Sequence, residues 1–266
     1  MRMKRVALAL SAAVVTACGS DTTGQLTVRL ADAACSDIAS AMVWVNQVYV
    51  IGGDDPGGPR YVISDQDAEY DLLDLQNGVT ALLGTATIPT GAYTQLRLVV
   101  DSARVTLRPG LTFTSGATSA LLVTPSAQQT GIKVNFSGPV TVDPGQTILV
   151  VDFDVCRNFL FTGPGAQPTG VLFRPVLHAT VVDVAGSIAG TVNPVAALAT
   201  IYGILNGDTV ASAAADPTTG AYVLQWLTPG TYAVGAKATG YQVATINGVA
   251  VAAQQNVTGV DFTLVP

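Results

Sequence analysis

Asp152 and Asp154 are the residues of this sequence whose type and spacing best suit acid chemistry. They end the apolar run 148–155, whose alternation predicts a strand with both carboxylates on one face. On one strand face, residues two apart lie about 7 Å from each other. Such a pair could hold a cation together with loop carbonyls, or act as the acid and base of a glycosidase. Hydrogen bonding to turns at the strand's end is the interpretation we favour, so the pair is only a weak metal candidate.

The rest of the chemical inventory argues against an enzyme. His178 is the sole histidine and lies in an alternating, strand-like run, where a hydrogen-bonded structural role is the default. No nucleophile elbow, His-Glu-x-x-His helix, P-loop or dinucleotide fingerprint is present in the sequence. A zinc site of ordinary ligand type is not expected with one histidine and three cysteines. The sequence therefore predicts a protein without catalytic residues or a cofactor.

The N-terminal segment predicts export and lipidation. Three basic residues among the first five precede the uncharged run 6–17, which ends at Cys18. A helix needs about 20 apolar residues to cross a bilayer, so this run is typical of a signal peptide. Residues 15–18, Val-Thr-Ala-Cys, resemble the lipobox of bacterial lipoproteins, in which the cysteine is acylated; an ordinary signal-peptidase site is the alternative. Gly19, in place of aspartate, favours the outer membrane over retention in the inner one.

The number of cysteines also supports location in the cell envelope. Lipidation of Cys18 leaves Cys35 and Cys156 as an even pair, and disulfides persist in an oxidising envelope. A Cys35–Cys156 disulfide is the favoured interpretation. Two separately buried thiols are the alternative, because free cysteine packs as a small apolar side chain.

Charge and composition limit the fold and the partners. Without residues 1–17 the chain keeps 249 residues, enough for two domains. Nine basic residues then face 18 acidic ones, so nucleic acid and anionic lipid headgroups should be repelled. Of the acids, 17 are aspartate, and Gly, Pro, Thr and Val are plentiful. This composition disfavours helices and suits strands joined by turns.

Five ordered segments of the first part carry a family resemblance. They are residues 70–78, 88–98, 125–126 with 131–133, 152–154 and 174–176. Together they resemble a bacterial lipoprotein domain family of unknown function, over residues 24–183. The resemblance implies an extracytoplasmic β-rich domain and brings no ligand or catalytic residue with it. Residues 32–35, Asp-Ala-Ala-Cys, depart from the usual Asp-Ala-Pro, so the two cysteines would be a local addition, which fits a bridge between them.

From about residue 184 the charge almost vanishes, which indicates a second domain, 184–266. Segments 186–192, 216–222, 227–234 and 240–241 resemble the carboxypeptidase regulatory-like (transthyretin-like) β-sandwich, of the carbohydrate-binding-like fold class. Residues 216–222 predict a hairpin. Tyr222, Leu224 and Trp226 should share one strand face, as should Tyr232 and Val234. Such stripes are usually core; the alternative is an exposed platform for ligand stacking, formed by Tyr202, Tyr222, Trp226, Tyr232 and Tyr241.

The sequence thus predicts an all-β protein with two β-sandwich-like domains in tandem, after a signal peptide (1–17) and a lipidated tether (18–23). We expect it in the cell envelope, held by its lipid, with the outer membrane favoured. The function we favour is a non-catalytic binding or adhesion module, with carbohydrate as a candidate ligand. The alternative is a structural or accessory lipoprotein that acts through another envelope protein.

Overall fold

The computed structural model of the chain describes residues 22–32, 37–53, 57–76, 78–123, 130–136, 140–163 and 167–266. The predicted signal peptide, Cys18 and Cys35 lie outside these residues. Among the residues described, no helix is both long and apolar enough to cross a membrane.

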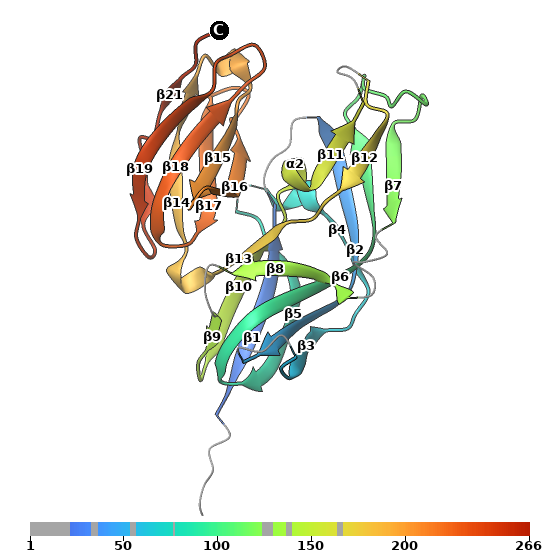
Figure 1. Ribbon diagram of the computed structural model, residues 1–266, viewed down its shortest axis with the longest axis vertical. Helices are drawn as coiled ribbons and strands as arrows, with labels where there is room; N and C mark the ends of the chain where they lie inside the picture. The colour runs from blue at the N-terminus through green and yellow to red at the C-terminus, as the bar shows by residue number, and fades with distance from the viewer. Residues whose placement is uncertain are drawn as a thin grey trace, which may run out of the picture.

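The chain is all-β, as predicted, and its strands build two units (Figure 1). The first unit, residues 22–184, contains thirteen strands, two 3-10 turns and one helical turn, and the second unit, residues 185–266, contains eight strands and one 3-10 turn among the residues described. The first unit comprises β1 (Thr23–Ala31), β2 (Ile38–Gly52), β3 (Arg60–Ser64), β4 (Ala68–Asp71), η1 (Leu72–Leu75), β5 (Ala81–Pro89), β6 (Gly91–Leu107), β7 (Ser119–Val123), β8 (Ile132–Phe136), β9 (Val140–Val142), β10 (Gln146–Asp152), α2 (Val155–Asn158), β11 (Phe159–Thr162), β12 (Gly170–Phe173), β13 (Leu177–Val181) and η2 (Val182–Val184). The second unit comprises β14 (Gly186–Asn193), η3 (Val195–Ala197), β15 (Thr200–Leu205), β16 (Asp208–Ala214), β17 (Ala221–Leu227), β18 (Gly230–Lys237), β19 (Ala244–Val251), β20 (Asn256–Val257) and β21 (Phe262–Thr263).

One mixed sheet dominates the first unit. Its order is β3-β2-β6-β8-β13-β10-β1-β5, with β4 beside β2 and with β7 and β9 beside β6. The long antiparallel pair β2–β6 forms its spine, and a shift of register near residues 45–47 marks a β-bulge in it. Two pairs are parallel, β1 with β10 and β13 with β8. The parallel pairing brings the C-terminal ends of β1 and β10 to the same edge.

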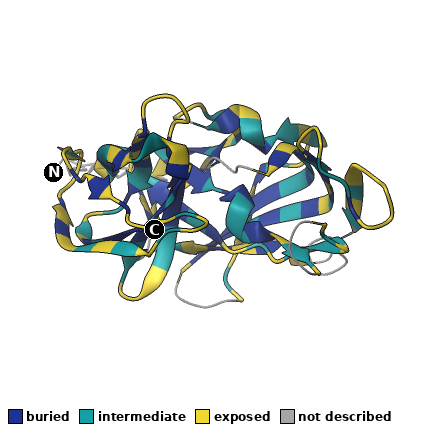
Figure 2. Cartoon of the chain, turned by 90° about the horizontal axis from the view of Figure 1, so that it is seen from above, coloured by how far each residue is buried: buried dark blue, intermediate teal, exposed yellow. Residues whose placement is uncertain are grey.

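The sheet curls so that its two end strands approach each other. A Cβ added at Gly84 of β5 would lie 2.8 Å from the carbonyl oxygen of Ile63 on β3, so only glycine fits there. Alternate residues of the strands point inward and form one apolar cluster, and the exposed residues gather at the loops (Figure 2). Near α2 the rings of Phe159 and Phe173 stack with centroids 4.9 Å apart and close one end of this core.

The second unit is a sandwich of two small sheets. One has the order β17-β14-β20, with β21 also beside β14, and the other has the order β16-β15-β18-β19. Their inner faces share a second apolar cluster. The predicted hairpin at residues 216–222 is wrong in one respect. Asp216 does make a tight turn, accepting from the backbone N–H groups of Thr218 and Thr219, but β16 pairs with β15 and β17 with β14. The turn therefore crosses between the sheets.

Candidate functional site

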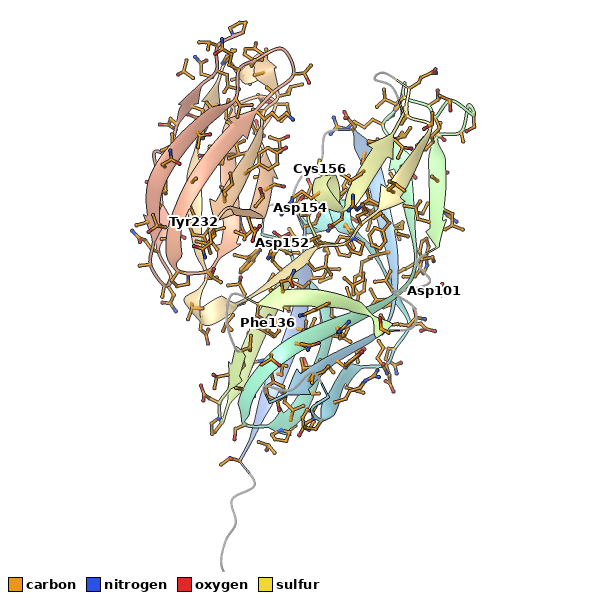
Figure 3. All side chains as sticks on the ribbon, viewed as in Figure 1. Asp101, Phe136, Asp152, Asp154, Cys156 and Tyr232 are labelled. Carbon is orange, nitrogen blue, oxygen red and sulfur yellow. The ribbon has the colours of Figure 1, made fainter. Side chains whose placement is uncertain are left out.

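The acid pair lies where the two units meet, and its geometry differs from the prediction (Figure 3). Strand β10 ends at Asp152, and Asp154 has a left-handed backbone, with φ 48°, as the N-cap of α2. The two carboxylates therefore do not share a strand face. The chain turns here because Asp154 Oδ1 accepts from the Arg157 N–H at 3.3 Å, which a straight strand could not provide.

Burial sets the charge of both carboxyl groups. It raises the pKa of Asp152, and the neighbouring Asp154 carboxylate raises it further. Burial also raises the pKa of Asp154, while the Arg157 guanidinium and nearby polar groups act in the opposite direction. One guanidinium thus stands beside the buried Asp154 and the half-buried Asp152.

Groups of the second unit complete this junction. Arg157 donates from its guanidinium to the backbone oxygen of Thr209 on β16. On the same strand the Ser212 hydroxyl lies beside Asp154 and helps to lower its pKa. Yet in the described part of the chain, Ser212 Oγ and Asp154 Oδ2, in side chains only 6% and 4% exposed, each lack a partner with hydrogen-bond geometry. Sequence reasoning missed Ser212, whose only signal is a lone hydroxyl among the alanines of residues 211–215.

His178 joins the same cluster. It lies on β13 as predicted and is the cross-strand neighbour of Asp152 on β10. Among the residues described, its Nε2 is buried without a hydrogen-bond partner. Burial lowers its pKa, and the charge of Arg157 lowers it further, whereas Asp208 raises it. The imidazole therefore resists protonation.

The structure also corrects the predicted orientation of Trp226. Between Ile188 and Gly186 of β14, strand β17 carries one extra residue, and this bulge rotates Trp226 away from the face that Tyr222 and Leu224 share. Its φ is 57°, a left-handed conformation that is rare for a bulky residue. Such strain persists only where surrounding structure enforces it, and it gathers at binding sites.

An open cleft of about 590 Å³ lies between the units, with Trp226 on its wall. The first unit contributes polar groups that include Gln76, Arg108 and Asp152. The second unit contributes Ser212, Asp216, Thr219 and Gln225 and the apolar surface of Leu198. Asp152 and Trp226 also line a small adjoining cavity of about 20 Å³, together with His178 and Thr228. That cavity is about the size of one water molecule.

The five aromatic candidates separate into two groups. Tyr222 and Tyr232 are buried, and their hydroxyls donate to the backbone oxygens of Val260 at 2.5 Å and Thr228 at 2.6 Å. These two rings belong to the core and cannot stack on a ligand. Tyr202, Trp226 and Tyr241 are half-buried, and of these three Trp226 lines the cleft, where the buried Tyr222 also contributes to the wall. The structure therefore does not bring the candidates together as one platform.

A metal centre has little support at the acid pair. Among the described residues, no three His, Cys, Asp or Glu side chains come together as a set that could hold a metal ion. Asp152 and Asp154 have Arg157 beside them, and a guanidinium repels a cation.

Several solved structures show weak likeness to the chain. The Bacillus anthracis TIE protein is 11% identical over 92% of this chain and 34% of that one, with a TM-score of 0.24. The minor pilin GBS52 of Streptococcus agalactiae is 12% identical over 91% and 97%, with a TM-score of 0.24. A cohesin–X-dockerin complex of Acetivibrio cellulolyticus is 24% identical over 28% of this chain and 52% of that one, with a TM-score of 0.23. The match thus spans about half of that last chain's length, and TM-scores this low support no inference about function.

No curated protein matches the chain. A family profile does match, over residues 23–168, which is more than half of the chain and contains β1 to β11 and the acid pair. That profile is described as a domain of unknown function. The chain belongs to this family, the domain of unknown function DUF4382.

Proposed function

We propose that this chain is a lipid-anchored protein of the bacterial envelope and acts as a non-catalytic binding module. Its binding site is the cleft between the two units, and its ligand is a neutral glycan. The observation that carries the proposal is Trp226, which a bulge holds in a left-handed backbone conformation on the cleft wall.

The chemistry of the cleft suits a hydroxyl-rich, uncharged ligand. An indole ring covers the C–H face of a sugar, and amide, guanidinium and hydroxyl groups meet its hydroxyls. Gln76, Arg108, Thr219 and Gln225 supply such groups around Trp226. An open cleft encloses little of a ligand, so we expect modest affinity.

The acid pair supports binding over catalysis. A glycosidase needs two carboxyl groups that reach the scissile bond from opposite sides. Here only Asp152 of the pair lines the cleft, and Asp154 is buried behind it as the cap of α2. Asp152 and Asp154 therefore do not present two carboxyl groups to one ligand in the cleft, whose other carboxyl groups belong to Asp32 and Asp216.

The start of the fold suits a short tether. Strand β1 begins at Thr23, five residues after Cys18, and five residues span at most about 17 Å. In Figure 1, β1 starts at the end of the molecule opposite the C-terminus. A lipid on Cys18 would hold the first unit near the bilayer and direct the second unit outward. We also propose that residues 24–183 and 184–266 are the two domains, the second a carboxypeptidase regulatory-like sandwich.

The proposal is tested by a glycan array with the full mature chain. Wild-type protein should bind a defined set of neutral glycans, and Trp226→Ala should lose that binding. Trp44→Phe is the matched control, because Trp44 lies on β2 with Arg104 over its ring and is not among the residues that line the cleft. A blank array for folded wild-type protein would reject the glycan ligand.

The second candidate function is that of an accessory lipoprotein that acts through another envelope protein. One exposed apolar surface supports it. Leu160 on β11 and Leu172 on β12 are direct cross-strand partners and are 38% and 51% exposed. An exposed apolar pair of this kind suits contact with another protein. Crosslinking on intact cells tests this candidate. The comparison is between wild type and the double variant Leu160→Ser with Leu172→Ser. Loss of one defined envelope protein from the crosslinked material would favour this second candidate.

A further inference from the structure

A second hollow adjoins the cleft at Trp226. It has a volume of about 250 Å³, against about 590 Å³ for the cleft. Its lining comes from the connection between η2 and β14, from Gln225 and Trp226 on β17, and from Asn256 on β20. Of the residues described, Gln225 and Trp226 alone line both spaces. These two side chains therefore form the boundary between the cleft and the hollow.

The bulge in β17 explains why two neighbouring side chains reach this boundary. The extra residue puts Gln225 and Trp226 together opposite Ser187 of β14. In a regular strand, one of two successive side chains would turn toward the core. Here both are half-buried instead. The Gln225 amide also packs against the first unit, since a Cβ added at Gly78 would lie 2.7 Å from Gln225 Oε1.

The hollow offers oriented polar groups and no charge. Ser187 Oγ donates to Asn256 Oδ1 at 2.8 Å, which fixes the orientation of the Asn256 amide. This bond uses the amide oxygen and leaves the two N–H donors of Nδ2 for another partner. Among the described residues that line the hollow, none carries a charged side chain, whereas several that line the cleft do. The hollow therefore suits a neutral group that carries hydroxyls.

We infer that the hollow is a second subsite of the proposed glycan site. The ligand is a chain of at least two linked neutral sugar units, which crosses Trp226 with one unit in the cleft and the next against Ser187 and Asn256. A single unit reaches only one of the two spaces, whereas a linked chain brings its second unit to the hollow at high effective concentration. The inference rests on the proposed function, because it takes the cleft as a glycan site.

The dependence of affinity on chain length tests the second subsite. The probes are neutral homo-oligosaccharides of glucose, galactose and mannose, together with any other neutral glycan that the array detects. Each is titrated into the full mature chain as the monosaccharide, the disaccharide and the trisaccharide, and Kd is measured by calorimetry. For a series that binds, we expect Kd to fall about tenfold from one unit to the longer chains, as added hydrogen bonds to the hollow would produce.

Substitutions separate the hollow from the cleft. Asn256→Ala, at an exposed position, should leave monosaccharide binding unchanged and abolish the gain with length. Ser187→Ala removes the hydroxyl that orients the Asn256 amide and should reduce the same gain. Asn247→Ala is the matched control, because Asn247 is exposed on β19 and is not among the residues that line either space. Trp226→Ala should weaken binding at every length.

The outcomes distinguish the second subsite from the proposed function. A gain with length that is lost in Asn256→Ala and kept in Asn247→Ala supports the subsite. Equal affinity for one unit and for the longer chains overturns the subsite and leaves the glycan site in place. A gain that persists in folded Asn256→Ala has the same meaning. If folded wild-type protein binds no neutral glycan at any length, the proposed function and the subsite are both rejected.

Discussion

Asp32 Oδ1 accepts a hydrogen bond from the Val155 N–H at 2.9 Å, which ties the C-terminal end of β1 to the turn after β10, 123 residues further along the chain. The Phe153 N–H donates to the oxygen of Ala31 beside it, at 3.0 Å. These two bonds extend the parallel pairing of β1 and β10 past the last strand residues and fix the position of the acid pair.

Asp32→Ala should therefore destabilise the first unit. The substitution leaves the buried Val155 N–H without this acceptor, which costs about 1–3 kcal/mol of unfolding free energy. Urea unfolding followed by circular dichroism measures the loss. Glu69→Ala, at an exposed position of the short strand β4, is the control and should change stability by less than about 0.5 kcal/mol. Equal midpoints for the two variants would contradict the role given to Asp32.

The same contact supports a disulfide between Cys35 and Cys156. Cys156 directly follows Val155 in α2, and Cys35 comes three residues after Asp32, which is within reach of the chain. Mass spectrometry of unreduced mature protein should find the two peptides joined. Cys35→Ser with Cys156→Ser should lower stability by up to roughly 4–5 kcal/mol, because the bond closes a loop of more than 100 residues. Two free thiols at these positions would rule the bridge out.

Lipidation makes a separate prediction. Cells fed a palmitate analogue should label the wild-type protein, and Cys18→Ala should lose both the label and membrane association. Cys156→Ser serves as the control, since it removes a cysteine without touching the lipobox and should keep the label. An unlabelled wild-type protein would reject the anchor and leave the glycan site untouched.

The Tyr232→Phe substitution tests whether the Tyr232 ring belongs to the core or to the ligand site. The Tyr232 hydroxyl donates to the Thr228 oxygen inside the second unit, so its removal should cost about 1 kcal/mol of stability. Glycan binding should not change, because the buried ring contacts no ligand. Val243→Ala, at an exposed position, is the stability control. Weaker glycan binding by the folded Tyr232→Phe protein would show that this tyrosine contributes to the ligand site after all.

The sequence by itself determined the class of fold and the inward positions of the strands. Turn-forming residues and β-branched residues exclude long helices, and alternation with period two shows which residues of a strand share a face. Tyr232 and Val234 lie on one buried face for this reason. The segments that carry the family resemblance were likewise readable without a structure, since they are local.

Only the tertiary structure shows which residues meet at the junction between the two units. Period two says nothing about which strand lies beside which, so the parallel pairing of β1 with β10 and the pairing of Asp152 with His178 could not be predicted. A one-residue bulge reverses every later side chain, and this is why Trp226 faces the cleft rather than the core. Asp154 left its expected strand face because it caps α2 by accepting from the Arg157 N–H. Only the packing of the second unit brings Ser212 beside it.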